Sequence, residues 1–163
     1  MKSKYIILST ISAVVLFLDQ ATKILIDRTM GLHTSITVMQ NFFHITYIRN
    51  KGAAFGFLAD SSFRLPFFIC VSIVAVVVIL AIFRKLRPEQ GFNAIALSLV
   101  FSGAFGNLID RVRLGEVIDF LDFHWYQHHW PAFNVADSAI CVGVFLLAID
   151  MLLDERRKKS ASQ

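Results

Sequence analysis

The segment "AIALSLVFSGAF" at residues 94–105 is followed directly by "GNLIDRVRLGEVIDF" at residues 106–120. The first segment carries no ionisable side chain, whereas the second brings together amide, acidic and basic groups: Asn107, Asp110, Arg111 and Asp119. Ionisable groups within an apolar helix are costly in lipid and by default mark a functional site. The fold class therefore depends on whether this part of the chain crosses a membrane.

The composition is that of an integral membrane protein. Of 163 residues, 56% are hydrophobic and only 17% are charged, and the mean hydropathy is +0.61. These values are typical of chains that bury long segments in lipid. The net charge is +4, but the basic residues cluster at the ends of apolar runs and form no continuous stripe. We therefore expect contact with membrane lipid and no binding of nucleic acid.

Four apolar stretches reach the length of about 20 residues that a membrane-spanning helix needs. They lie at about residues 5–26, 65–83, 92–112 and 133–153. Lys2 and Lys4 precede the first stretch as they would in a signal peptide, but no small-x-small cleavage site follows, so we expect a retained helix. The pattern predicts an all-α membrane protein, a four-transmembrane-helix bundle that forms one integral membrane domain over residues 1–163.

The basic residues beside these stretches predict the orientation of the bundle. They occupy the N-terminal flank, the connection between the second and third stretches, and the C-terminal tail: Lys2, Lys4, Arg84, Lys85, Arg87, Arg156, Arg157, Lys158 and Lys159. By the positive-inside rule these flanks, and so both termini, are cytoplasmic. The polar residues of the first, third and fourth stretches then lie at the extracytoplasmic ends: Asp19, Gln20, Lys23, Asn107, Asp110, Arg111, Asn134, Asp137 and Ser138. A polar site open toward the extracytoplasmic face is predicted.

These polar residues have a structural and a functional interpretation. Each charge alone could extend into the headgroups or form a structural ion pair, such as Asp19 with Lys23 at i, i+4. Their arrival at one depth from three helices favours a functional site. We also expect Asp110 to pair with its neighbour Arg111, because a buried guanidinium needs a partner. Small residues of the third stretch would let neighbouring helices approach closely: Ser98, Ser102, Gly103 and Gly106.

The remaining segments predict a small extracytoplasmic β-hairpin or sheet and a short surface helix or lid. Within an insertion of about residues 27–64, "TSITVMQNFFHITYIRN" at 34–50 has the alternation of a hairpin. "GAAFGFLADSSF" at 52–63 is typical of a lid on the membrane surface. The outer loop "HWYQHHW" at 124–130 suits an interfacial aromatic belt. Cys70 and Cys141 are predicted to be small core residues without a disulfide.

Serine and zinc chemistry fit these residues poorly. Ser138 is a candidate nucleophile, but no lysine shares its helix face and the histidines all lie in loops. His124, His128 and His129 are potential zinc ligands, yet the sequence has no HExxH motif and no closely spaced helical pair. No metal is therefore predicted.

A pair of carboxylates is the simplest interpretation of the site. Asp119 follows the third stretch and Asp137 lies one turn inside the fourth, so the two are neighbours if these helices are. Close carboxyls share one proton, which leaves one of them as a base toward water. This is aspartic-protease chemistry, and it needs no cofactor. Asp122 lies three residues after Asp119, and spacing alone does not distinguish the two.

Five motifs resemble, in order and topology, those of the lipoprotein signal peptidases, the bacterial signal peptidase II family. They are "DQATK" at 19–23, "RNKGAAFG" at 49–56, "GNLIDR" at 106–111, "GEVIDFLDF" at 115–123 and "FNVADS" at 133–138. The resemblance implies that Asp119 and Asp137 are the catalytic pair. It also implies the substrate, a prolipoprotein whose cysteine carries diacylglycerol. Cleavage just before that cysteine, by a monomer in the bacterial cytoplasmic (inner) membrane, is expected.

The same resemblance implies that further residues line or support the site: Asn50, Gly52, Asn107, Asp110, Arg111, Asn134, Asp19 and Lys23. The alternative function is a small four-span transporter coupled to protons or cations. A transporter needs charge near the membrane midplane, whereas the middles of the second and third stretches contain none. A purely structural assembly protein would leave the polar residues unexplained.

Overall fold

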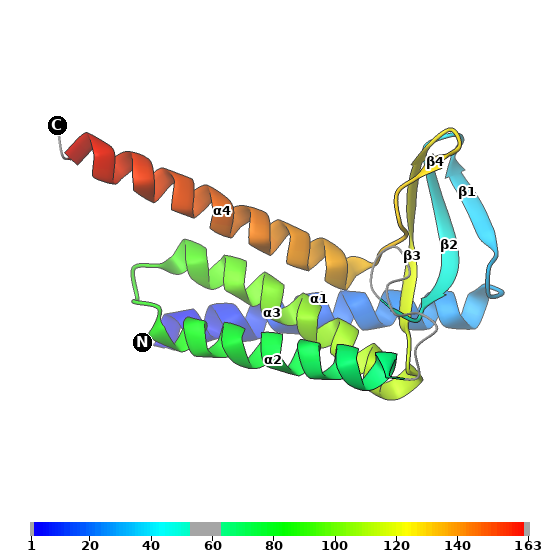
Figure 1. Cartoon of the computed structure of the whole chain (residues 1–163), viewed down its shortest axis with the longest axis horizontal. Coiled ribbons are helices and arrows are strands. Elements are labelled where there is room, and N and C mark those ends of the chain that lie inside the picture. The colour runs from blue at the N-terminus through cyan, green and yellow to red at the C-terminus, as the bar shows by residue number, and fades with distance from the viewer. Residues whose placement is uncertain (1, 53–62, 162–163) are drawn as a thin grey trace.

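Four long helices and a small antiparallel sheet form the protein (Figure 1). The computed structural model describes residues 2–52 and 63–161. The helices are α1 (Lys2–Thr29), α2 (Arg64–Lys85), α3 (Gly91–Leu114) and α4 (Val135–Ala161). Each contains a segment long and apolar enough to cross a membrane, so the predicted four-helix membrane fold is confirmed. Both ends of the chain lie away from the sheet, at the other end of the bundle (Figure 1).

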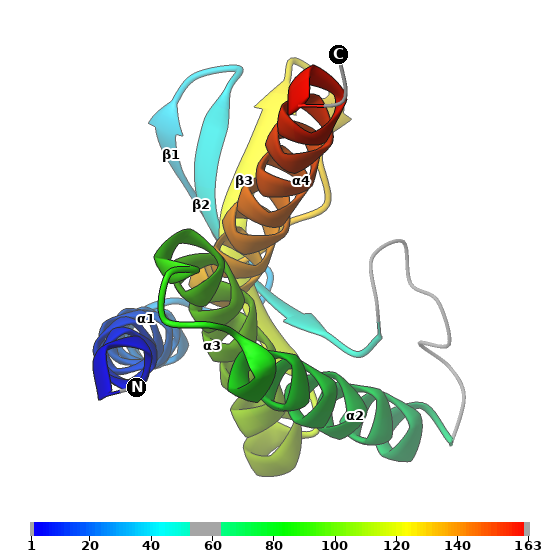
Figure 2. The same ribbon diagram turned by 90° about the vertical axis from the view of Figure 1, so that its left-hand side faces the viewer.

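Helix α3 lies at the centre of the bundle and packs against α1, α2 and α4 (Figure 2). Its glycines allow the close approach that their spacing predicts. An added Cβ at Gly103 would lie 2.2 Å from the Ala136 carbonyl oxygen, and one at Gly106 would lie 2.7 Å from Asp19 Oδ2. Both distances are shorter than a normal contact, so larger residues here would push α4 and α1 away from α3.

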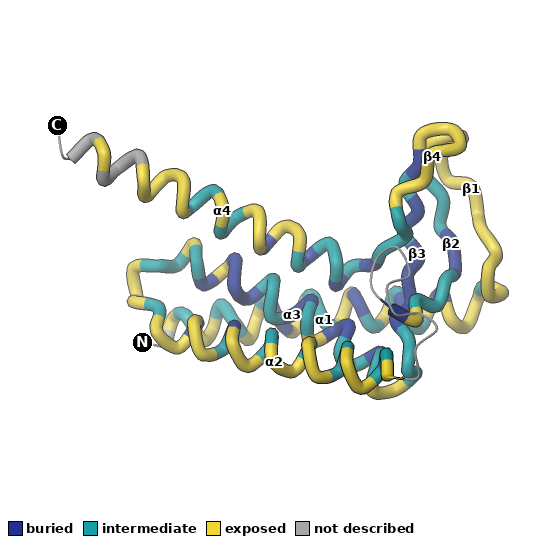
Figure 3. Tube along the Cα trace, viewed as in Figure 1, coloured by how far each residue is buried: buried dark blue, intermediate teal, exposed yellow. Residues whose placement is uncertain are grey.

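Exposed residues occupy much of the outer faces of the helices (Figure 3), and many of them are large apolar residues. Val77 on α2 is 58% exposed and Phe145 on α4 is 64% exposed, as expected for surfaces that face lipid. Cys70 and Cys141 also lie on exposed helix faces and are free thiols. The prediction that they are core residues is therefore wrong, because an apolar run in a membrane helix also includes exposed positions.

The sheet contains strands β1 (Ser35–Met39), β2 (Phe43–Asn50), β3 (Val117–Trp125) and β4 (His128–His129), antiparallel and in that spatial order. Strands β1 and β2 form the predicted hairpin, and Asn41 in its turn has a φ of 59°, which asparagine tolerates well. Pairing of β2 with β3 places Ile48 opposite Asp119. The sheet stands where α1 and α3 end and α4 begins (Figure 1).

Strand β3 begins three residues after the third helix, where no strand was predicted. Residues 117–120 are all buried, and Ile118 and Phe120 pack with Ile26 and Tyr47. Because both faces of this part of the strand are covered, it lacks the apolar and polar alternation that identifies a half-exposed strand. Residues 53–62, which make up most of the predicted lid, lie outside the described residues.

Candidate active site

The start of α4 places the Asp137 side chain. Asn134 precedes the helix, and its Oδ1 accepts the Asp137 N–H at 3.0 Å, while Asp137 Oδ2 accepts the Asn134 N–H at 3.2 Å. This reciprocal arrangement is a capping box, encoded here as N-x-x-D. The other carboxylate oxygen, Oδ1, accepts Asn107 Nδ2 of α3 at 2.7 Å. Neighbours on α3 and at the helix start therefore fix both oxygens of Asp137.

Asp119 comes from β3 and shares a partner with Asp137. Its Oδ1 accepts Asn134 Nδ2 at 2.7 Å and its Oδ2 accepts Asn50 Nδ2 at 2.9 Å. Asn134 therefore contacts both aspartates. Its carboxamide nitrogen donates to Asp119, and its backbone N–H and carboxamide oxygen both bind Asp137. Burial and, second, the negative charge of Asp137 raise the pKa of Asp119 to about 7, although the two amide donors lower it. Such a pair can share one proton near neutral pH.

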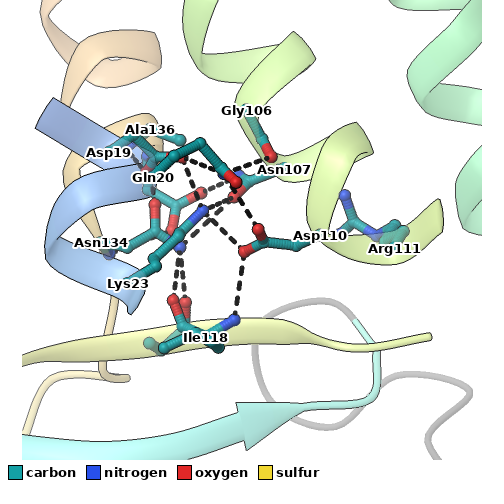
Figure 4. Close-up of polar contacts among 12 residues, drawn as sticks. Asp19, Gln20, Lys23, Gly106, Asn107, Asp110, Arg111, Ile118, Asn134 and Ala136 are labelled. Carbon is teal, nitrogen blue, oxygen red and sulfur yellow. Dashed lines mark hydrogen bonds and ion pairs between the residues drawn. The ribbon is translucent and has the colours of Figure 1, made fainter. Parts of the chain in front are cut away.

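Behind the aspartates, a buried ion cluster joins α1 to α3 (Figure 4). Lys23 Nζ lies 3.0 Å from Asp19 Oδ2 and 2.8 Å from Asp110 Oδ2. Gln20 Nε2 donates to both carboxylates, at 3.0 Å each. Asp19 Oδ1 also accepts the Ala136 N–H at 2.9 Å, which satisfies a donor in the first turn of α4. The cluster therefore holds the ends of α1, α3 and α4 together.

The predicted pairing of Asp110 with Arg111 is wrong. Asp110 binds Lys23, and Arg111 points away from that cluster (Figure 4). Arg111 Nη1 lies 3.4 Å from Ser72 Oγ, and its guanidinium carbon lies 5.4 Å from the Phe68 ring centroid, both on α2. Adjacent residues of a helix are about 100° apart around its axis. Asp110 therefore faces α1, whereas Arg111 faces α2.

A cavity of about 610 Å³ opens beside the two aspartates. The predicted site residues that line it are Asn50, Gly52, Asn107, Arg111, Asp119 and Asp137. Apolar side chains of α2 and α4 supply much of the remaining wall, among them Phe68, Val71, Ala75 and Ile140. The other predicted residues, Asp19, Lys23, Asp110 and Asn134, are buried and do not line it. The residues that line the cavity can therefore contact a substrate, whereas the buried residues hold the lining residues in place.

Asp122 lies on the opposite face of β3 from Asp119, because successive strand residues alternate between faces. His129 Nδ1 lies 2.8 Å from the Asp122 carboxylate, and His44 Nδ1 lies 3.9 Å from it. His124 is buried between these two rings, with centroids 4.3 Å from His44 and 4.5 Å from His129. The predicted interfacial position is therefore wrong for His124. Within the described part of the chain, no three potential ligands gather as a metal site.

Comparison with known proteins identifies the family. A family model described as signal peptidase (SPase) II matches residues 11–153. The chain belongs to the signal peptidase II family. The lipoprotein signal peptidase of Geobacter sulfurreducens is 66% identical to it over 97% of this chain and 99% of that protein. The one from Geobacter metallireducens is 65% identical, over 97% and 98% of the two chains.

Membership of the signal peptidase II family decides between the predicted functions. The protein is a multi-pass membrane protease that removes signal peptides from prolipoproteins, and it is not a transporter. A solved bacterial membrane enzyme, studied by the in meso method, superposes with a TM-score of 0.84 and 39% identity, covering 93% of this chain and 90% of that one. A second such structure gives a TM-score of 0.80 at 39% identity, over 89% and 92% of the chains.

Two parts of this candidate site were not predicted. Gln20 was expected at the extracytoplasmic end but not as a site residue, although it bridges the two carboxylates of the ion cluster. Its signal was available, because it sits inside the motif "DQATK". Ser72 and Phe68 contact Arg111 from a helix without internal charge. No local pattern marks them, because their role arises only where α2 packs against α3.

Proposed function

We propose that Asp119 and Asp137 are the catalytic pair of an aspartic endopeptidase. The observation that carries the proposal is Asn134, which binds both carboxyl groups at the edge of one cavity. Two carboxyls that share a donor beside a substrate-sized cavity are what a shared-proton mechanism needs. The pKa of Asp119, raised to about 7, supports retention of one proton near neutral pH.

The reaction is hydrolysis of one peptide bond. The ionised carboxylate takes a proton from water as the water oxygen attacks the carbonyl carbon, and the protonated carboxyl donates a hydrogen bond to the carbonyl oxygen. The tetrahedral intermediate then collapses, the C–N bond breaks, and the amine leaves with a proton from the pair. Proton transfer of this kind contributes about 10² to 10⁴ to the rate. No step requires a metal or an organic cofactor.

The substrate of this reaction is a prolipoprotein whose cysteine carries diacylglycerol, cut just before that cysteine. The apolar walls that α2 and α4 contribute support this choice, because they can hold acyl chains. Arg111 lies in the same cavity and can donate to a substrate carbonyl. The enzyme acts as a monomer in the bacterial inner membrane. Its basic flanks support cytoplasmic termini and an extracytoplasmic active site.

Single substitutions test the catalytic pair. We expect Asp119→Asn and Asp137→Asn each to lower cleavage of a diacylglyceryl-modified lipobox peptide by about 10³-fold or more, because either change removes the unit that activates water. Asp122→Asn is the matched control, since it makes the same chemical change on the opposite face of β3, and it should keep most of the activity. Thermal unfolding in detergent checks that each variant folds. An active Asp119→Asn enzyme, or an inactive Asp122→Asn enzyme, would overturn the assignment.

A further inference from the structure

Lys23 is buried behind the active site and uses every donor it has. Its Nζ lies within hydrogen-bonding distance of three acceptors: Asp19 Oδ2 at 3.0 Å, Asp110 Oδ2 at 2.8 Å and Asn107 Oδ1 at 3.0 Å. An ammonium group has three N–H donors and no acceptor. The residue is 1% exposed, so bulk water does not compete for these partners. Asn107 is therefore held by a group that can only donate.

Asn107 connects this cluster to Asp137. Its Oδ1 accepts from Lys23 and, at 3.3 Å, from Asn134 Nδ2, while its Nδ2 donates to Asp137 Oδ1 at 2.7 Å. The two ends of a carboxamide are similar in size, so hydrogen-bond partners decide which end faces which way. In the flipped orientation the amide NH₂ would face the ammonium, and the amide oxygen would face the carboxylate. Both contacts are repulsive, so Lys23, together with Asn134 and Asp137, favours the orientation that offers Asp137 a donor.

We infer that Lys23 is a positioning residue for cleavage and acts on Asp137 through the carboxamide of Asn107; this inference rests on the proposed function. The directed donor fixes the Asp137 carboxylate at the edge of the cavity, where it can accept a proton from water. A structural ion pair would instead hold the helices together, and its loss would leave kcat unchanged in an enzyme that still folds.

The charge balance of the cluster allows positioning to be separated from charge. Removal of Lys23 alone would leave two buried carboxylates without their cation. It would also raise the pKa of Asp119, which the positive charge of Lys23 lowers. The double variant Asp19→Asn/Lys23→Met removes one charge of each sign, so the net charge of the cluster does not change. Methionine has a similar length to lysine and cannot donate a hydrogen bond to Asn107.

The test compares this double variant with Asp19→Asn/Lys23→Gln, whose amide can still donate to Asn107. With a diacylglyceryl-modified lipobox peptide, we expect the methionine variant to lose about 10- to 100-fold in kcat while KM stays within about twofold. The kcat of the glutamine variant should be about threefold or more above that of the methionine variant. In an Asn107→Ala background, the methionine pair should change kcat by less than about twofold, because the route to Asp137 is already absent.

Asn93→Ala/Asp150→Ala is the matched control. It removes a 2.9 Å hydrogen bond between α3 and α4 at the other end of α3 and should leave kcat unchanged. Thermal unfolding in detergent reports whether each variant folds. If the methionine variant does not fold, the kcat of the glutamine variant is compared alone and in the Asn107→Ala background. Wild-type kcat in a folded methionine variant, or an equal loss with and without Asn107, would overturn the inference. An active Asp119→Asn enzyme would instead overturn the proposed function.

Discussion

The residues of the proposed active site show how ionisable groups are stabilised at the edge of a membrane. Asp119 is only 3% exposed, yet both of its oxygens accept amide N–H groups, from Asn50 on β2 and from Asn134 before α4. Lys23 likewise has acceptors on two helices, in Asp19 and Asn107. These hydrogen bonds offset the cost of burial and at the same time fix the geometry of the site.

The pH dependence of cleavage follows from the environment of Asp119. Its pKa is raised to about 7, and the hydrogen bond from Asn50 lowers it. The proposed mechanism needs the Asp119–Asp137 pair to keep one proton, so kcat should fall as the pH rises through the upper apparent pKa of the pair. Asn50→Ala removes a donor to the ionised form and so raises that pKa. We therefore expect the alkaline limb of the kcat profile to move to higher pH, and movement to lower pH would contradict this account.

At the scale of elements, the site depends on how helix ends meet the sheet. Gly115 follows α3 with a φ of 75°, and its N–H bonds the Arg111 carbonyl at 3.1 Å. This left-handed ending suits glycine, and it redirects the chain into β3 two residues later. The capping box of Asn134 and Asp137 begins α4 at the same place. The two aspartates are thus positioned by a strand start and a helix start that adjoin.

Two glycines of α3 give a paired prediction about helix packing. An added Cβ at Gly103 would lie 2.2 Å from the Ala136 carbonyl oxygen, whereas one at Gly91 would have no atom within 4 Å. Gly103→Ala should therefore lower the free energy of unfolding by about 1–3 kcal/mol or more, because the backbone of α4 must move. Gly91→Ala should change it by no more than about 0.5 kcal/mol. Thermal unfolding in detergent measures both, and equal effects would show that α3 and α4 do not pack this closely.

At the scale of the whole molecule, a lipid-facing bundle carries a sheet at one end and both chain ends at the other (Figure 1). The cavity lies at the sheet end, between the helices and β3. Exposed Trp125, Tyr126 and Trp130 extend from the sheet region, and aromatic residues of this kind prefer the interface between lipid and water. The proposed active site thus lies where the proposed membrane-anchored substrate would meet water.

The orientation of the molecule can be measured by labelling. With Cys70 and Cys141 replaced by serine, His44→Cys and Tyr126→Cys should react with a membrane-impermeant thiol reagent in intact spheroplasts. Lys85→Cys should react only after permeabilisation, because it ends α2 at the opposite end of the bundle from the sheet. Labelling of Lys85→Cys alone in intact spheroplasts would show that the active site faces the cytoplasm.

Features that depend on short stretches of chain could be predicted from the sequence. Each apolar run is long enough to span a bilayer, and lipid favours a helix because every backbone group must be satisfied within the segment. The alternation at residues 34–50 was sufficient for the β1–β2 hairpin. Asp19, Asn107 and Asp137 were expected to meet because each lies at the predicted extracytoplasmic end of its helix. The five motifs that resemble the signal peptidase II family could also be recognised, because each one is a short stretch of consecutive residues.

Contacts between elements were decided only by the tertiary structure. Asp119 and not Asp122 lines the cavity because β3 is a strand, whose successive residues face opposite sides. The sequence did not predict this strand, because both faces of residues 117–120 are buried and the apolar and polar alternation is absent. Asp110 binds Lys23 and not Arg111 because of how α3 is rotated about its axis between α1 and α2. The rotation of a helix and the burial of a strand depend on many side chains that are distant in sequence. A local pattern can therefore place a residue near the site but cannot determine which partner it meets there.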